Sequence, residues 1–518
     1  MSTRTGDFPG GLHLDGHKTP SSGRAVETMP VPPLLVFPLH QHIGEPALPV
    51  VEVGESVLAG QLIAHAEDYV SAPVHASTSG RVVAIEKRPV PHPSGLPAEC
   101  IVVEADGEDR QAPCEAPGDF ETMDLSALRN RIREAGIVGM GGAGFPTFIK
   151  LNPGPGGDID TVVLNGVECE PYITCDDRLM QERAADIVSG ALIIRHAVGA
   201  GRCVIGVEDN KPKAAAALRA AARDGVTVQT VVTRYPAGGE KQLIKILTGR
   251  EVPSDGLPLN AGVVVQNVAT AAAIFHAVSE GRPLISRVVT VTGPGVAEPR
   301  NLEVRLGTPV ADVLAHCGAD TAAVRAVVVG GAMMGFAIHD LASPVVKTTN
   351  CLLVDAVADD ADQPQMPCIR CGACVEVCPQ LLLPQQLYWY ASVRDFDKVQ
   401  DYSLFDCIEC GCCNFVCPSH IPLASYFRFA KNEIWAQERE RQRADRARER
   451  HEFNQARKEQ EERERQERHR RKKARLKDPP DEAAPADSKK AAVQEALKRA
   501  QARKEGLEAG TEGTEDRG

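Results

Sequence analysis

The sequence lacks a long apolar run. It has 518 residues, of which 43% are hydrophobic and only 4% aromatic. Its most apolar window, "AGVVVQNVATAAAIFHAV", is interrupted by Gln266, Asn267 and His276. Because a spanning helix needs about 20 consecutive apolar residues, we expect no direct membrane insertion. The opening "MSTRTGDFPGGLHLDGHKTPS" has no apolar centre, which argues against a signal peptide.

An excess of positive charge is also missing. The chain has 58 basic and 70 acidic residues, which gives a formal net charge of −12. Affinity for nucleic acid rests on neutralising phosphates with Lys and Arg. The charge therefore argues against nucleic acid as the main partner, and the length predicts about three or four domains.

Cysteine, in contrast, is abundant, with 16 in the chain. Nine of them occur in two runs, "CIRCGACVEVCP" beginning at Cys368 and "CIECGCCNFVCP" beginning at Cys407, and eight of the nine share one spacing. Both runs read C-x2-C-x2-C-x3-C-P, the ligand spacing of bacterial ferredoxins with [4Fe–4S] clusters. Disulfides and zinc are the alternatives, but zinc ribbons use paired C-x2-C hooks. Thiol-rich sites without a secretory leader indicate a reducing cytosol.

The spacing also predicts which cysteines share a cluster. Three thiolates two residues apart wrap one loop around a cube, and the fourth of each run ligates the other cube. The expected ligand sets are Cys368, Cys371, Cys374 and Cys417 for one cluster, and Cys407, Cys410, Cys413 and Cys378 for the other. Cys412 falls out of register. We expect each fourth cysteine to open the following helix, next to Pro379 or Pro418.

The predicted fold is multidomain α/β. "TVVLNGV", "RCVIGVE" and "VTVQTVVTRY" are typical of buried parallel strands and alternate with helical stretches. The expected parts are an N-terminal extension (1–31), a barrel-sandwich-like β domain (32–120), an α/β domain (121–285), a small soluble-ligand-binding-like β-rich domain (286–355), a ferredoxin-like helical domain for two clusters (356–430) and a charged helical or disordered tail (431–518).

The β domain over 32–120 has the pattern of a biotinyl/lipoyl-type barrel sandwich, with short β-branched runs separated by Gly and Pro. A carrier domain needs a lysine at its hairpin tip, whereas this region has Glu67, Asp68 and Tyr69. We therefore expect a structural module rather than a carrier.

A glycine-rich loop, "GMGGAGFPTFIKL", contains Gly139, Gly141 and Gly144 in a G-x-G-x-x-G frame. The dinucleotide fingerprint follows a strand, whereas this loop follows a helical stretch, so a Rossmann assignment does not follow. The loop still offers unobstructed backbone N–H groups before a helix start near Pro146 and Thr147. That arrangement suits a phosphate.

At this point the sequence resembles a known family. "GMGGAGFPTFIKL", "LNGVECEP", "YPAGGEKQLIKILTGR" and "VVVQNVAT" are similar, in the same order, to segments of the flavin- and NADH-binding subunit of respiratory complex I. The combination with a barrel sandwich and a two-cluster domain resembles the C subunits of the Rnf/Rsx ion-translocating electron transport complexes. "GGLHLDGHKTP" and "KKAAVQEALKRAQARK" also fit that family.

The resemblance implies FMN as a cofactor, NAD(H) as substrate and no proton-transferring catalytic side chain. It makes 121–285 the FMN/NADH-binding domain. The implied contacts are Gly139, Gly141, Gly142 and Gly144 at the phosphates, Lys150 as a nearby cation, Phe145 stacked on a nucleotide ring, Asn165 at the flavin, Glu168 and Glu170 at the nicotinamide, and Glu240 and Asn267 closing the site. The family's polar residues are replaced at Met140, Val167, Gly239, Gln266 and Ala269.

The implied function is that of a peripheral electron-transfer subunit. It would exchange electrons between NAD(H) and two [4Fe–4S] clusters that connect to integral membrane and iron–sulfur partner subunits. Its place would be the cytoplasmic face of the bacterial inner membrane. Three alternatives are a cobalamin reductase of similar build, a soluble diaphorase of a hydrogenase or formate dehydrogenase, and a non-catalytic electron-carrying adaptor with a vestigial flavin site.

The register of the second cysteine run yields a first prediction. The chain reconstituted anaerobically should bind about eight irons. Cys412→Ser should leave that content unchanged, because Cys412 is outside the ligand frame, whereas Cys413→Ser should lose a cluster. Iron analysis checks both variants, and an equal loss in the two would contradict the register.

Overall fold

The structure is a computed structural model that describes residues 7–114, 119–154, 157–355, 364–477 and 486–508. The chain forms two compact units, Met1–Ile434 and Trp435–Gly518. The segment "AVADDADQPQMP", which we expect to be a linker before the cysteine-rich part, falls mostly outside the described residues.

The barrel-sandwich part consists of two small antiparallel sheets. The first has the order β2 (Leu34–Pro38), β8 (Ala98–Ala105), β7 (Gly80–Arg88) and β4 (Ser56–Val57), and the second β3 (Leu48–Pro49), β5 (Leu62–His65) and β6 (Val74–His75). Apolar side chains from both sheets, including Phe37, Ile63 and Ile101, form one buried core. Glu67, Asp68 and Tyr69 lie in the exposed loop between β5 and β6.

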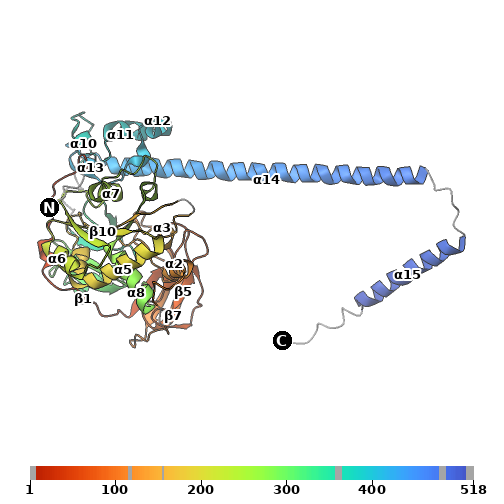
Figure 1. Ribbon diagram of the computed structural model, residues 1–518, viewed down its shortest axis with the longest axis horizontal. Coiled ribbons are helices and arrows are strands. Elements are labelled where there is room, and N and C mark those ends of the chain that lie inside the picture. The colour runs from red at the N-terminus through yellow and green to blue at the C-terminus, as the bar shows by residue number, and fades with distance from the viewer. Residues whose placement is uncertain (1–6, 115–118, 155–156, 356–363, 478–485, 509–518) are drawn as a thin grey trace. The chain divides into compact units, whose positions relative to one another are not determined.

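The centre of the first unit is a four-stranded parallel sheet (Figure 1). Its order is β11 (Val226–Val231), β10 (Arg202–Glu208), β9 (Thr161–Gly166) and β12 (Val263–Asn267). Successive side chains of a strand point to opposite faces. Leu164 accordingly packs with helices α5 and α8, and Val163 packs with α7. Both faces are covered, as expected for a parallel sheet.

The helices and the 3-10 turn of this part are α2 (Leu125–Glu134), α3 (Thr147–Lys150), α4 (Cys175–Glu182), α5 (Ala184–Val198), α6 (Pro212–Ala221), α7 (Glu240–Thr248), η1 (Pro258–Ala261) and α8 (Val268–Glu280). Helices α5 and α8 pack closely because Gly190 has no side chain. A Cβ there would stand 1.9 Å from the Ala271 carbonyl oxygen.

A six-stranded mixed sheet follows in the chain. Its order is β1 (Glu27–Thr28), β14 (Arg300–Arg305), β13 (Ser286–Thr292), β17 (Cys351–Val354), β15 (Val327–Val329) and β16 (Phe336–Ile338), with α9 (Val310–His316) packed against it. The edge strand β1 comes from the N-terminal segment, just after α1 (Thr19–Ser22). Residues 7–31 are therefore part of the folded unit.

The cysteine-rich part is helical, with α10 (Ala373–Glu376), α11 (Pro384–Ser392), α12 (Phe396–Asp401), η2 (Leu404–Asp406), α13 (Cys412–Phe415) and the start of α14 (Leu423–Lys477). One expectation is wrong. Cys378 and Cys417 do not open helices, because α11 and α14 begin six residues after them. Turns containing Pro379 and Pro418 separate ligand and helix.

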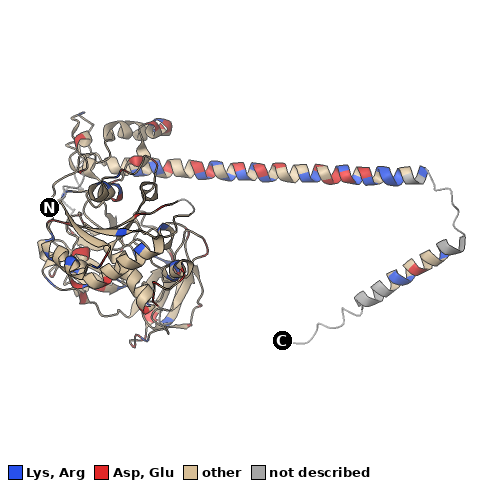
Figure 2. Ribbon diagram, viewed as in Figure 1, with Lys and Arg blue, Asp and Glu red and all other residues tan. Residues whose placement is uncertain are grey.

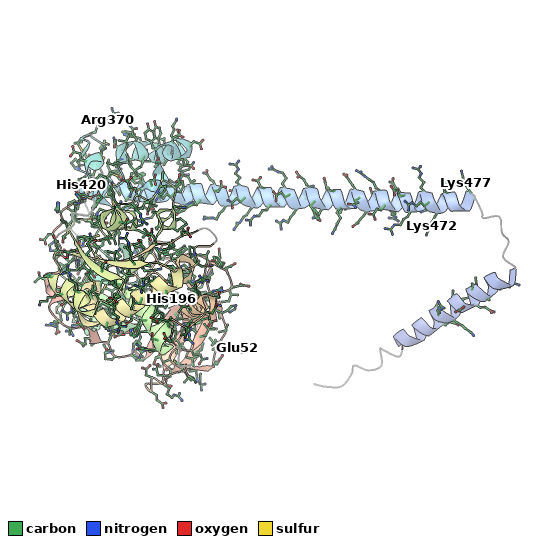
Figure 3. All side chains as sticks on the ribbon, in the orientation of Figure 1. Glu52, His196, Arg370, His420, Lys472 and Lys477 are labelled. Atoms are coloured by element: carbon green, nitrogen blue, oxygen red, sulfur yellow. The ribbon has the colours of Figure 1, made fainter. Side chains whose placement is uncertain are left out.

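The second unit is made of helices. Helix α14 runs to Lys477, in agreement with the helical alternative expected for the tail, and α15 (Ala486–Glu508) follows. Acidic and basic residues intermingle along α14 as far as Glu467, and only basic charges follow over 468–477 (Figure 2). The i,i+4 pairs include Arg457–Glu461 at 3.7 Å and Arg468–Glu464 at 3.3 Å. Side chains over 436–474 are exposed (Figure 3). Across the described ranges, no helix has the length and apolarity that crossing a membrane requires.

Candidate functional site

The predicted site residues gather at the carboxyl edge of the parallel sheet. From β9 the chain builds β10 and β11 to one side and later returns to place β12 on the other. Asn165 of β9 and Asn267 of β12 are register partners at this reversal. In open α/β sheets, ligands bind in the crevice outside the carboxyl ends at such a switch point.

The glycine loop lies at this edge, where a Cβ on Gly141 would meet Asn267 at 3.5 Å. Two hydrogen bonds close the loop, from Gly139 N to Phe145 O at 2.8 Å and from Gly144 N to Gly139 O at 3.2 Å. In the part of the chain that the structure describes, the exposed Gly141, Gly142 and Ala143 have no acceptor for their N–H groups. Such free donors fit a phosphate.

Two of the loop glycines are needed for different reasons. Gly142 has φ +113°, and a Cβ there would point into open space, where a ligand can approach. Gly144 has φ +66°, and a Cβ would stand 2.7 Å from Thr348 Cγ2. Gly144 thus lets the loop pack against the protein, rather than exposing backbone to a ligand as Gly142 does.

The candidates Lys150, Glu240 and Asn165 meet beside the loop. Lys150 Nζ donates to Glu240 Oε1 at 2.6 Å, and both side chains are about one-third exposed. Asn165 Nδ2 donates to the Gly238 carbonyl at 2.8 Å, which fixes the turn before α7 against the end of β9. Phe145 is half-buried next to the loop's closing hydrogen bond.

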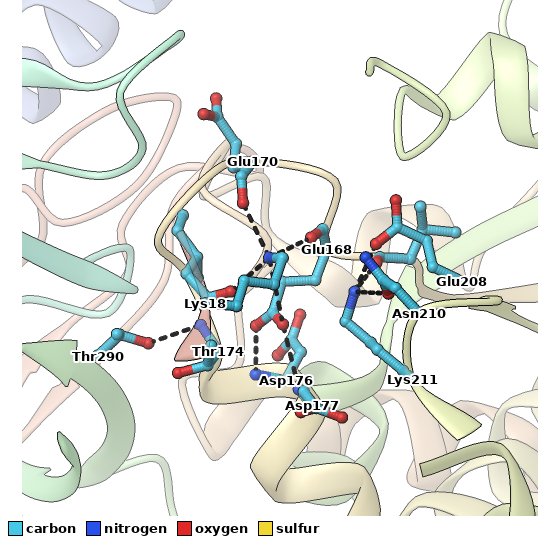
Figure 4. Close-up of polar contacts among 12 residues, drawn as sticks. Lys18, Glu168, Glu170, Thr174, Asp176, Asp177, Glu208, Asn210, Lys211 and Thr290 are labelled. Atoms are coloured by element: carbon cyan, nitrogen blue, oxygen red, sulfur yellow. Dashed lines mark hydrogen bonds and ion pairs between the residues drawn. The ribbon is translucent and has the colours of Figure 1, made fainter. Parts of the chain in front are cut away.

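Glu168 and Glu170 lie on the loop after β9, and a residue absent from the sequence-based prediction holds that loop (Figure 4). Lys18 Nζ donates to the carbonyls of Glu168 and Glu170, both at 2.9 Å, and of Ile173 at 2.6 Å. Lys18 Nζ is also 4.0 Å from the Glu168 carboxylate. The N-terminal segment thereby fixes the acidic loop.

The two glutamates are half-buried residues in different settings. The Glu168 carboxylate accepts from the backbone N–H groups of Asp176 at 2.6 Å and Asp177 at 3.3 Å, at the start of α4. Glu170 accepts from Met333 N at 3.1 Å, while its Oε1 is buried without a partner among the described residues. Burial raises the pKa of Glu170 to about 7 and raises that of Glu168 as well.

Asn267 joins the acidic loop to the start of α8. Its Nδ2 donates to Asp176 Oδ2 at 2.6 Å, and its Oδ1 accepts from Ala269 N at 2.8 Å as the helix cap. Nearby, the buried Lys211 bonds to Glu208 and donates to the Val167 carbonyl at 2.7 Å. The polar residues around the crevice therefore hold one another in place.

The eight cluster cysteines surround two cavities. Cys368, Cys371, Cys374 and Cys417 line one cavity of about 460 Å³. A narrower cavity is lined by Cys378, Cys407, Cys410 and Cys413, together with Cys412. We call these the outer and inner cluster sites. Each combines three cysteines of one run with the fourth of the other, and all eight are free thiols, so the donor sets fit two iron–sulfur cubes.

The two sites differ in exposure. In the inner site Cys378, Cys410 and Cys413 are buried, whereas in the outer site Cys371 is exposed. Exposure is one of the factors that set the potential of a cluster. The two sites are therefore not equivalent electrostatically.

The two ligand loops share one backbone conformation. Arg370 and Glu409, at equivalent positions, have φ +56° and +57°, and Gly372 and Gly411 have φ +85° and +74°. This repeat matches Cys412 with Ala373, the first residue of its helix. Cys412 is fully buried, and its thiol contacts the Cys410 sulfur, which lowers the pKa of Cys410.

The inner cluster site packs directly on the α/β domain that contains the glycine loop, which we call the flavin-loop part. The Tyr235 hydroxyl donates to the Cys410 carbonyl at 2.6 Å, and Tyr235 is buried with Cys410 and Cys412. The N-terminal segment adds backbone bonds to both sides, from Gly11 N to Val377 O at 2.9 Å and between Leu12 and Tyr235 at 2.8 Å. Tyr235 and Lys18 lie in segments that carry the family resemblance, but the resemblance implied no role for either residue.

Four family descriptions match the chain. They are "RnfC Barrel sandwich hybrid domain" over 6–108, "Nuo51 FMN-binding domain" over 132–276, "SLBB domain" over 288–337 and "4Fe-4S dicluster domain" over 367–421. Fold and site thus define a protein with an FMN-binding domain and a 4Fe-4S dicluster domain.

Individual proteins that are similar over most of this chain identify its family. The C subunit of the ion-translocating oxidoreductase complex of Pseudomonas aeruginosa is 50% identical over 452 residues, covering 87% of this chain and 58% of the relative. The protein of the same description from Salmonella gallinarum is 47% identical over 456 residues, covering 88% of this chain and 68% of the relative. The chain belongs to the family of the C subunits of ion-translocating oxidoreductase complexes.

Two further comparisons show how far the similarity to known proteins extends. The chain spans 58% of the length of the Pseudomonas relative. Among solved structures, an NAD+-reducing [NiFe]-hydrogenase in the H2-reduced state aligns with a TM-score of 0.43 and 19% identity over 62% of each chain. A likeness of that size carries no functional argument.

Proposed function

We propose that the chain is the peripheral subunit that exchanges electrons between NAD(H) and two [4Fe–4S] clusters in an ion-translocating oxidoreductase complex. One observation carries this proposal. The free N–H groups of the glycine loop and the inner cluster site belong to one compact unit, and Tyr235 joins that site to the flavin-loop part. A bound flavin supplies the conversion between a hydride and single electrons.

The chain's residues would bind and orient the cofactor and NAD(H). Free backbone donors of the loop suit the phosphates, and the Lys150 ammonium adds positive charge beside them. Glu170 offers one unpaired carboxylate oxygen on the nicotinamide side. The proposed contacts are Gly139, Gly141, Gly142, Gly144, Phe145, Lys150, Asn165, Glu168, Glu170, Glu240 and Asn267. In this proposal no side chain transfers a proton.

The outer cluster site is the proposed exit toward partner subunits. Its Cys371 is exposed, and large apolar side chains surround it, with Ile369 67% and Trp389 43% exposed. A contiguous exposed apolar patch marks an interaction surface. We therefore propose that an iron–sulfur or integral membrane subunit of the same complex docks at this face.

The proposed location is the cytoplasmic face of the bacterial inner membrane, held there by protein partners. Support for this location comes from the family. For truncation experiments we propose the divisions 1–31, 32–120, 121–285, 286–355, 356–430 and 431–518.

The flavin loop is tested with Gly142→Val. A branched side chain would occupy the open space above the loop and disfavour φ +113°. We expect FMN binding to be lost and NADH-driven bleaching of the clusters to slow about a hundredfold, while dithionite still bleaches them. Anaerobic absorbance spectroscopy of chain loaded with both clusters and FMN measures this.

Gly54→Val is the matched control, because Gly54 also has a positive φ and open space at its Cβ but lies in the barrel sandwich. In Gly54→Val, NADH should bleach the clusters at the same rate as in the unmodified chain. If Gly142→Val keeps its FMN and its rate, the loop is not the flavin site.

The location is tested by sedimentation. The chain should pellet with membranes only when its partner subunits are co-expressed, and truncation after Ala430 should reduce the pelleted fraction little. Binding of the full chain to protein-free liposomes at physiological salt, to the same extent as to native membranes, would contradict docking through protein partners.

A further inference from the structure

A further cavity, of about 470 Å³ and separate from both cluster sites, lies between helices α4 and α8 and the strands β13 and β14. Its volume falls within the range of small-molecule sites. Of the flavin loop only Met140 lines it, and none of the proposed flavin and NAD(H) contacts does. The cavity is therefore separate from the site described above.

Arginine dominates the charged lining of this cavity. Among the described residues that line it, four are Arg and one is Glu. Three of the arginines have carboxylate partners, which are Glu303 for Arg183, Glu280 for Arg282 and Asp109 for Arg305.

The fourth arginine, Arg287, is different. It is only 3% exposed, and within the described ranges no carboxylate lies within 4.0 Å of it. Its guanidinium donates to the carbonyls of Lys347 and, at 3.2 Å, of Met140. Its Nε is buried without a hydrogen-bond partner among those residues.

A buried cation without a counter-charge is costly. Asp176 and the Cys175 thiol act on Arg287 only from beyond ion-pair distance, and burial lowers the pKa of Arg287. An anion in the cavity would supply the missing charge and accept from Nε. A guanidinium presents planar donors that match carboxylate and phosphate.

The apolar residues that line the cavity indicate the chemistry of the uncharged part of the ligand. Ala272, Leu284 and Val288 contribute buried apolar surface to the cavity. A bare inorganic ion would leave this surface without contacts. An anion that carries an apolar group would use both parts of the wall.

We propose that this cavity binds a small organic anion, a carboxylate or phosphate ester with an apolar body, whose charged end pairs with Arg287. This goes beyond the proposed electron transfer, since it adds a second ligand. Arg287 also donates to the carbonyl of Met140, whose N–H donates to Thr270 at 2.9 Å. A ligand bound in this cavity would therefore affect the flavin loop through Arg287 and Met140.

Phenyl phosphate is the probe, with calorimetric titration of the full chain loaded with both clusters. We expect saturable binding of one equivalent, with inorganic phosphate at least tenfold weaker because it lacks the apolar body. If phenyl phosphate shows no saturable binding up to about 10 mM, its affinity is too weak for a specific site. That result would overturn the proposal.

Two variants distinguish the cavity from other places. Ala273→Phe fills the cavity without touching the Arg287 contacts, and it should weaken binding at least tenfold, as should Arg287→Gln if that variant folds. Ala315→Phe, on the exposed surface of α9, is the matched control and should bind like the unmodified chain.

Gly142→Val separates this cavity from the flavin loop, which also suits phosphate. Binding of phenyl phosphate should persist in that variant. Loss of binding in Gly142→Val, or unchanged binding in Ala273→Phe, would place the probe elsewhere and contradict the proposal. The failure of this proposal would leave the electron-transfer proposal untouched, because the latter is measured by cluster bleaching.

Discussion

The hydrogen bond from the Tyr235 hydroxyl to the Cys410 carbonyl is the contact on which the rest of the molecule depends. It connects the turn before α7, at the carboxyl edge of the parallel sheet, with a cysteine ligand loop. Tyr235 is buried with Cys410 and Cys412, so water does not compete for this bond. The bond fixes the inner cluster site beside the crevice in which the flavin loop lies.

The N-terminal segment reinforces the same constraint. It bonds to Val377 in the cysteine-rich part, pairs with Tyr235, and then inserts Lys18 among three carbonyls of the acidic loop. The half-buried Lys18 ammonium loses part of its solvation, and three carbonyl acceptors compensate for this loss. One short stretch of chain thereby orders the acidic loop and the contact between the two cofactor regions together.

Some of this arrangement could be predicted from the sequence, where the chemistry depends on local spacing. The 2-2-3 spacing of the cysteines led to the crossed grouping now found around the two cavities. Strand and helix alternation predicted the parallel sheet, and the glycine frame predicted free N–H groups. Of the two alternatives expected for the charged tail, helical or disordered, α14 is the helical one.

Other features could not be predicted, because they join residues that are distant in the chain. Lys18 contacts residues about 150 positions away, and no periodicity encodes that contact. The pairing of β1 with β14 is of the same kind. The expected helix start at Cys378 failed because a turn follows the ligand instead. Arg287 is inconspicuous in the sequence, since only burial makes its unpaired Nε unusual.

We propose that electrons from NADH reach the inner cluster site before they reach the outer one. Cys407→Ser and Cys368→Ser remove equivalent ligands from the inner and the outer site. Rapid-mixing absorbance with NADH should show fast bleaching of the remaining cluster in Cys368→Ser, and much slower bleaching in Cys407→Ser. Equally fast bleaching in Cys407→Ser, with dithionite reducing both variants fully, would contradict the account.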